Sequence, residues 1–133
     1  MKTLPWWVNA IVIAGALLLG TGGSIALLRP EMLVTPHVEM NSAARVYAGY
    51  LVSRNLALAV MLIAAWVTGA RQALSCLMTL AALVQFFDAG LDASEGRIIL
   101  VPGIIALGAL FSLAATRLSG RLFWKETLDP SVE

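Results

Sequence analysis

Residues 6–28 read WWVNAIVIAGALLLGTGGSIALL, a continuous stretch without a charged side chain. An α-helix of about 20 apolar residues crosses the hydrocarbon core of a bilayer, which is about 30 Å thick. The stretch therefore predicts a transmembrane helix over residues 6–28.

The same stretch has an alternative interpretation as a cleaved signal peptide. Lys2 precedes the apolar run, and Ser24-Ile25-Ala26 resembles a cleavage site. The apolar part of a signal peptide is about 7–15 residues long. Because the run here is longer than that, we favour a retained membrane helix.

Three more apolar stretches are long enough to cross a bilayer, at residues 47–68, 73–91 and 98–116. Short breaks such as Gly69-Ala70-Arg71-Gln72 separate the last three helices, which makes successive helices antiparallel. We predict an all-α, polytopic integral membrane protein whose single domain, residues 1–133, is an up-down four-helix transmembrane bundle. Residues 119–133 are expected to form a C-terminal tail at the interface.

The composition agrees with lipid as the solvent. The chain is 59% hydrophobic and 13% charged, with a mean hydropathy of +0.85, and a soluble fold of 133 residues cannot bury that much apolar surface. A net charge of +1 without a basic stripe argues against nucleic acid as a partner. Cys76 and His37 are the only residues of their types, so we expect no disulfide, metal site or cofactor.

Basic residues are distributed unevenly between the two ends of the predicted bundle. The end that holds both termini carries Lys2, Arg71, Arg117, Arg121 and Lys125, and the opposite end carries Arg29, Arg45 and Arg97. Because Lys and Arg are enriched in cytoplasmic loops, we expect both termini in the cytoplasm, in a bacterial inner membrane. The end with both termini also holds the four tryptophans, Trp6, Trp7, Trp66 and Trp124.

Small residues recur every four positions in two predicted helices, at Ala16, Gly20 and Ser24 and at Gly108 and Ser112. Such rows let helices approach closely, which favours association where lipid supplies no hydrophobic drive. We expect them to form packing seams within the bundle or contact surfaces of a homo-oligomer.

Four polar residues interrupt the second and third predicted helices. Arg54 and Asn55 lie about two turns, roughly 10 Å, inside the second helix, so Arg54 should face protein or water rather than lipid. In the third helix, Gln85 and Asp88 share one face with Asp92. Counted from the turn between the helices, Arg54 and Asp88 are at matching depth. We therefore predict an ion pair between them, with Asn55 and Gln85 supplying further hydrogen bonds.

This cluster has two interpretations. A buried ion pair can serve only to set the register of two helices, whereas intramembrane ionisable groups commonly mark substrate, ion or proton sites. In the functional interpretation, Asp88 and Arg54 are catalytic: Asp88 exchanges a proton and Arg54 holds an anionic or carbonyl oxygen. The substrate-binding residues are then Asn55, Gln85, Tyr47 and Tyr50. Anchoring at the interface is the alternative role of the tyrosines.

Three functions are compatible with these features. The first is a binding site for the polar head of a lipophilic molecule, such as a quinone, isoprenoid or lipid. The enzymatic form of this hypothesis is an isomerase or cyclase that uses Asp88 as an acid. The second is a non-catalytic assembly partner of a membrane complex. The third is a small proton-coupled exporter, although small multidrug carriers have a carboxylate in their first helix and residues 6–28 contain none.

Three short segments and one acidic residue follow one another along the chain: Leu27-Leu28-Arg29-Pro30-Glu31, Arg54-Asn55-Leu56-Ala57-Leu58, Arg71-Gln72-Ala73-Leu74 and Asp88. In this order the chain resembles a group of small four-helix membrane proteins, distantly DoxX-like, classed as domains of unknown function. The resemblance extends over the first three predicted helices. It implies the four-helix fold and the importance of the Arg54 and Asp88 positions. It implies no established activity, although some DoxX-like proteins are associated with quinone or redox partners.

Overall fold

The computed structural model describes residues 4–33 and 41–120. These residues form four α-helices, α1 (Trp6–Leu28), α2 (Ser42–Val67), α3 (Arg71–Ser94) and α4 (Val101–Ser119), and a short 3₁₀ helix η1 (Pro30–Leu33). All four α-helices are long and apolar enough to cross a membrane. No strand occurs in the part of the chain described. The protein is an all-α integral membrane protein, as the sequence predicted.

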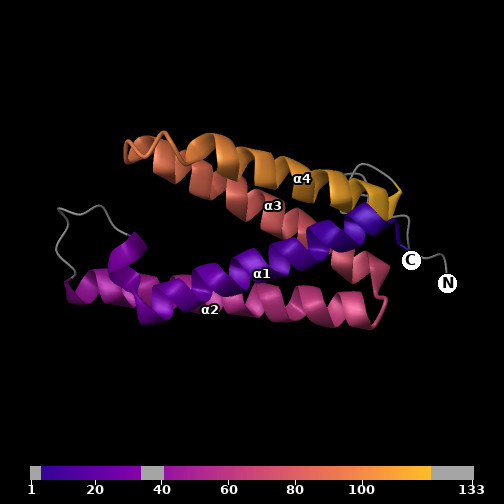
Figure 1. Cartoon of the computed structure of the whole chain (residues 1–133), viewed down its shortest axis with the longest axis horizontal. Helices are drawn as coiled ribbons and strands as arrows, with labels where there is room; N and C mark the ends of the chain where they lie inside the picture. The colour runs from indigo at the N-terminus through magenta and orange to yellow at the C-terminus, as the bar shows by residue number, and fades with distance from the viewer. Residues whose placement is uncertain (1–3, 34–40, 121–133) are drawn as a thin grey trace, which may run out of the picture.

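The helices form two antiparallel pairs, α1 with α2 and α3 with α4 (Figure 1). The start of α1, the turn between α2 and α3, and the end of α4 lie at one end of the molecule. The connection from α1 to α2 and the turn from α3 to α4 lie at the other end.

Three of the four helices begin or end a few residues away from their predicted ranges. α2 begins at Ser42 rather than at residue 47, because the side chain of Asn41 accepts a hydrogen bond of 2.9 Å from the backbone N–H of Ala44 and caps the helix. α3 extends over Arg71–Ser94 rather than 73–91, and α4 begins at Val101 rather than at residue 98. Hydropathy marks only the lipid-immersed part of a helix, whereas caps and turns decide where the helix itself begins and ends.

The core of the bundle is built from aliphatic and small side chains contributed by all four helices, together with Phe111, which is 1% exposed. Large apolar side chains on the outer surfaces, such as Leu17 and Val60, are 66% and 64% exposed and face the lipid. Two side-chain hydrogen bonds set the registers of the helix pairs. Trp66 Nε1 donates to Asn9 Oδ1 between α2 and α1, and Ser75 Oγ donates to the carbonyl of Ala115 between α3 and α4, each at 2.9 Å.

The predicted small-residue row of α1 is only partly a packing seam. Ala16 is buried, but an added Cβ at Gly20 would meet nothing within 4 Å, and Ser24 is exposed. Close approach uses Gly15 and Gly23 instead, because an added Cβ would lie 2.8 Å from Phe111 at the first and 3.2 Å from Leu56 at the second. A helix rich in small residues has such rows on several faces, and the shape of its neighbours selects among them.

Candidate intramembrane binding site

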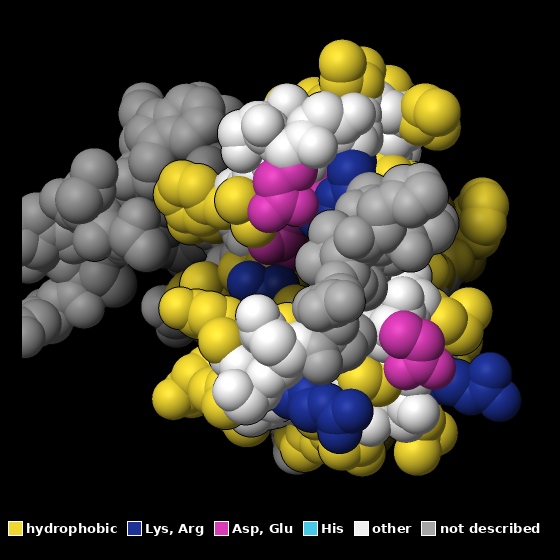
Figure 2. All heavy atoms as spheres, turned by 90° about the vertical axis from the view of Figure 1, so that its left-hand side faces the viewer, with side chains coloured by type: hydrophobic (Ala, Val, Ile, Leu, Met, Phe, Trp, Pro, Cys, Tyr) yellow, Lys and Arg dark blue, Asp and Glu magenta, His cyan; other side chains and the backbone are white. Residues whose placement is uncertain are grey.

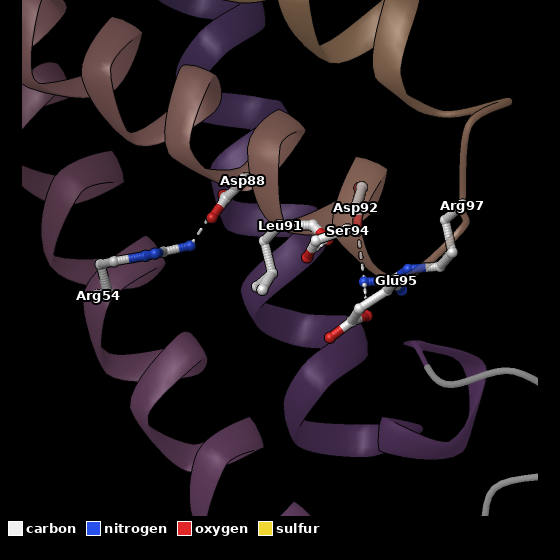
Figure 3. A network of polar contacts seen from close by, with 7 residues as sticks. All are labelled: Arg54, Asp88, Leu91, Asp92, Ser94, Glu95 and Arg97. Atoms are coloured by element: carbon white, nitrogen blue, oxygen red, sulfur yellow. Dashed lines mark hydrogen bonds and ion pairs between the residues drawn. The ribbon is translucent and has the colours of Figure 1, made fainter.

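Arg54 of α2 and Asp88 of α3 form an ion pair that joins the two helix pairs. The Nη2 atom of Arg54 lies 3.1 Å from the Oδ2 atom of Asp88, and the side chains are 39% and 35% exposed (Figure 3). Because α2 begins at Ser42, Arg54 lies roughly 18 Å from the start of the helix. A charge within an apolar helix is costly in a membrane, and the opposite charge of Asp88 offsets that cost.

Asn55 lies beside the ion pair and is 9% exposed. Its Oδ1 atom accepts a hydrogen bond of 3.4 Å from Nε of Arg54, as predicted for an amide next to the pair. The neighbouring helix α1 leaves room for this side chain with two glycines. An added Cβ would lie 3.4 Å from Asn55 Nδ2 at Gly22 and 3.6 Å from Asn55 Cβ at Gly23. The asparagine is therefore held between its own helix and α1.

A cavity of about 150 Å³ lies next to Asn55, and all four helices contribute to its wall. Its lining residues are Gly15, Leu18, Leu19, Asn55, Gln85, Leu107 and Phe111. The two amides, from α2 and α3, are the polar side chains of this wall, and the others are apolar. The cavity thus combines hydrogen-bonding groups with an apolar surround, as sites for small molecules do.

Gln85 does not supply the hydrogen bond to the ion pair that the sequence predicted. Its side chain lines the cavity and makes no hydrogen bond with any described residue. Gln85 is three residues before Asp88, so it lies nearly one turn away along α3. At that level it faces the cavity, and its amide offers two donors and one acceptor there.

Tyr47 and Tyr50 are 73% and 68% exposed, on the part of α2 that leads to the Asn41 cap. Neither lines the cavity, and neither hydroxyl makes a hydrogen bond with another described residue. The structure therefore brings Arg54, Asn55, Gln85 and Asp88 to one region and leaves the two tyrosines on the surface of α2.

Asp92 takes part in a second group of charges, which sequence analysis missed. Its carboxylate pairs with Nη2 of Arg97, which also lies 3.1 Å from Oε2 of Glu95. Figure 3 shows these three residues at the turn from α3 to α4, with Leu91 between them and the Arg54–Asp88 pair. Although Asp92 shares a helix face with Asp88, its partner comes from the turn. The sequence signal for this pair was an arginine, Arg97, placed just after the end of the helix and close to Asp92 along the chain.

Figure 2 shows this end of the molecule face-on, with acidic and basic side chains gathered on the face and hydrophobic side chains around much of its outline. Asp92 is 7% exposed, so its pair with Arg97 is shielded. The carboxylate of Glu95 is 53% exposed and more accessible to water. The ionic contacts at this end therefore differ in burial, which bears on what each contributes to stability.

No protein-family model, curated protein or solved structure matches this chain.

Among residues 4–33 and 41–120, no group of three or more His, Cys, Asp or Glu side chains could hold a metal ion. Cys76 is exposed on α3. His37 and most of the predicted tail, residues 121–133, lie outside the described residues.

Proposed function

We propose that the cavity between the four helices binds the polar head of a lipophilic small molecule, such as a quinone, isoprenoid or lipid. The observation that carries this proposal is the amide of Gln85, which faces the cavity without a hydrogen-bond partner among the described residues. An unpaired polar group in an apolar setting costs free energy, and a bound carbonyl or hydroxyl oxygen would remove that cost.

The proposed ligand-binding roles follow from the chemistry of each side chain. Gln85 and the Nδ2 group of Asn55 donate hydrogen bonds to an oxygen of the head group, while Leu107 and Phe111 contact its apolar part. Arg54 adjoins the cavity through its hydrogen bond to Asn55 and adds positive charge on that side. The amide hydrogen bonds and the positive charge of Arg54 would both increase the affinity for a carbonyl oxygen.

In the enzymatic form of this proposal, the protein is an isomerase or cyclase. Asp88 is paired with Arg54 and does not line the cavity, so this form requires the pair to open and Asp88 to reach the substrate. The protonated Asp88 carboxyl group then gives a proton to one carbon of the substrate and takes a proton back from another, so no co-reactant is consumed, while Arg54 holds an oxygen of the substrate. Without such a substrate, the same pair would act only as a link between α2 and α3.

A binding experiment with two glutamine variants tests the proposal. The purified full chain in detergent micelles is titrated with a short-chain quinone and, separately, with a short isoprenoid alcohol, and the rise in unfolding temperature gives the affinity. We expect Gln85→Leu to weaken binding of the preferred ligand about tenfold, the equivalent of one hydrogen bond of about 1.4 kcal/mol. The matched control is Gln72→Leu, because Gln72 is exposed at the start of the same helix.

Stability separates loss of binding from loss of folding. Because Gln85 has no hydrogen-bond partner in the described structure, Gln85→Leu should leave the unfolding temperature of the ligand-free protein unchanged or raise it. The proposal fails if neither ligand stabilises the native protein, or if Gln72→Leu weakens binding as much as Gln85→Leu does.

We also propose that the membrane is a bacterial inner membrane, with the α3–α4 turn on the extracytoplasmic side. The support is the count in the sequence, five basic residues at the end with the α2–α3 turn against three at the other end; Arg71 and Arg117 are the members of the larger set that the structure describes. The ion pair of Arg54 then lies in the half of the bundle that is nearer the outer surface.

A further inference from the structure

A second hollow lies on the outside of the α1–α2 pair. It is a groove of about 510 Å³ between the two helices, and it shares no lining residue with the cavity at Asn55. Its floor is made of small residues, Ala16, Gly20 and Ala59, and its sides include Leu17 and Ile63. Leu17 and Ile63 are 66% and 50% exposed, so the groove opens towards the surrounding lipid.

The groove exists because α1 lacks side-chain volume at its centre. An added Cβ at Gly20 would meet no atom within 4 Å. One turn further along, Ser24 Oγ donates a hydrogen bond of 2.8 Å to the carbonyl of Gly20, so this hydroxyl donor is used within the helix. The groove is therefore apolar over most of its length, and it has room for a chain that is thinner than an α-helix.

The length of the groove corresponds to the depth of one membrane leaflet. Its lining residues on α1 run from Ala16 to Arg29, roughly 20 Å along the helix axis. Half of a hydrocarbon core of about 30 Å is about 15 Å. The groove therefore extends from the level of the bilayer centre to the surface at the end of α1, which is the course that a lipid acyl chain follows.

A positive charge lies at the surface end of this groove. Arg29 follows the last residue of α1, is exposed, and makes no ion pair or side-chain hydrogen bond with any described residue. Glu31 comes two residues later and forms no ion pair with it. An arginine at this level matches a lipid phosphate, whose oxygens its guanidinium can bind in a bidentate manner.

We propose that the α1–α2 groove binds one acyl chain of an anionic phospholipid, whose phosphate group pairs with Arg29. The apolar groove accounts for the acyl chain, and the position of Arg29 at its outer end accounts for the preference for negative charge. This lipid site is independent of the proposed function, because the groove and the inner cavity have separate walls.

Native mass spectrometry of the full chain in detergent micelles tests the site. The protein is titrated with phosphatidylglycerol and with phosphatidylcholine of the same acyl chains, and the affinity for the first bound lipid is measured. We expect phosphatidylglycerol to bind more tightly to the native protein. Arg29→Gln should reduce that preference about fivefold, because one basic residue near the membrane surface contributes roughly that factor.

Two other variants complete the test. Arg45→Gln is the matched control, because Arg45 is an exposed arginine near the start of α2, at the same end of the bundle, but does not line the groove. Gly20→Leu fills the groove and should weaken binding of both lipids, and it should fold because leucine favours a helix more than glycine does.

Three results would overturn the proposal. One is equal affinity of the native protein for the two lipids. Another is an equal effect of Arg29→Gln and Arg45→Gln, which would indicate a general effect of surface charge. The last is a Gly20→Leu protein that keeps its native unfolding temperature and also its native lipid affinity.

Discussion

Arg54 on α2 and Asp88 on α3 are joined by an ion pair of 3.1 Å across the boundary between the two helix pairs. The packing within each pair of helices is more extensive than the packing of α2 against α3. The ion pair is therefore placed where a polar link adds most to the cohesion of the bundle. It also adjoins the inner cavity through Asn55, so the structural role and the proposed binding role involve the same side chains.

Removing one member of this pair leaves an unpaired charge in the membrane. We expect Arg54→Leu and Asp88→Leu to lower the free energy of unfolding by about 1–2 kcal/mol each. This loss is small for a hydrogen bond between charged groups, because both side chains are partly exposed. The double variant Arg54→Leu/Asp88→Leu should recover most of that loss, since apolar side chains replace both charges. Denaturant unfolding in micelles measures the free energy of unfolding of each variant. If the double variant lost the sum of the two single losses, the expected coupling between Arg54 and Asp88 would be contradicted.

Gly15 is needed for the contact between α1 and α4. We expect Gly15→Ala to lower the free energy of unfolding by about 1–3 kcal/mol, because the new Cβ would lie 2.8 Å from Phe111, which is 1% exposed. Gly20→Ala is the control and should raise stability by about 0.5–1 kcal/mol through helix propensity alone. If Gly15→Ala were as stable as Gly20→Ala, the close packing of α1 on Phe111 would be wrong.

Ser75 links α3 to α4 through a buried hydrogen bond to the carbonyl of Ala115. Ser75→Ala should cost about 0.6 kcal/mol, the average for interhelical hydrogen bonds measured in membrane proteins. Ser94→Ala serves as the control, since that hydroxyl is exposed and bonds to the carbonyl of Leu91 in its own helix. Thermal unfolding of both variants under one set of conditions would show the difference, and an equal effect would argue against the link.

Asp92 and Glu95 both contact Arg97 but differ in burial, because their side chains are 10% and 53% exposed. We expect Asp92→Asn to destabilise the α3–α4 turn by about 1–3 kcal/mol and Glu95→Gln to change stability by less than about 0.5 kcal/mol. Hydrogen exchange of the backbone amides at residues 91–101 would detect local opening of the turn. Similar protection in the two variants would show that burial does not separate their contributions.

Cysteine labelling tests the proposed orientation. In a Cys76→Ala background, Ser94→Cys introduces a thiol at the α3–α4 turn and Thr68→Cys introduces one at the α2–α3 turn, both at exposed positions. A membrane-impermeant maleimide added to intact cells should label the first variant and not the second. The reverse pattern would place both termini outside the cytoplasm.

The sequence predicted the polar cluster partly because helix geometry is regular. A rise of about 1.5 Å per residue from a common turn is enough to place Arg54 level with Asp88. It was not enough to place Gln85 or Asp92, because two residues on one helix face can meet different neighbours at different levels. Asp92 meets Arg97 at the turn, and Gln85 faces the cavity.

The sequence by itself determined that the chain is a four-helix membrane protein and that helices joined by short turns are antiparallel. Both follow from the lengths of the apolar stretches and of the connections between them, which are properties of consecutive residues. Only the tertiary structure decided which face of each helix is buried, that Gly15 and Gly23 rather than Gly20 make close contacts, and where the cavity and the groove lie. The physical reason is that rotation of a helix about its axis depends on how its side chains fit those of its neighbours, and a helix rich in small and apolar residues offers several faces that can pack.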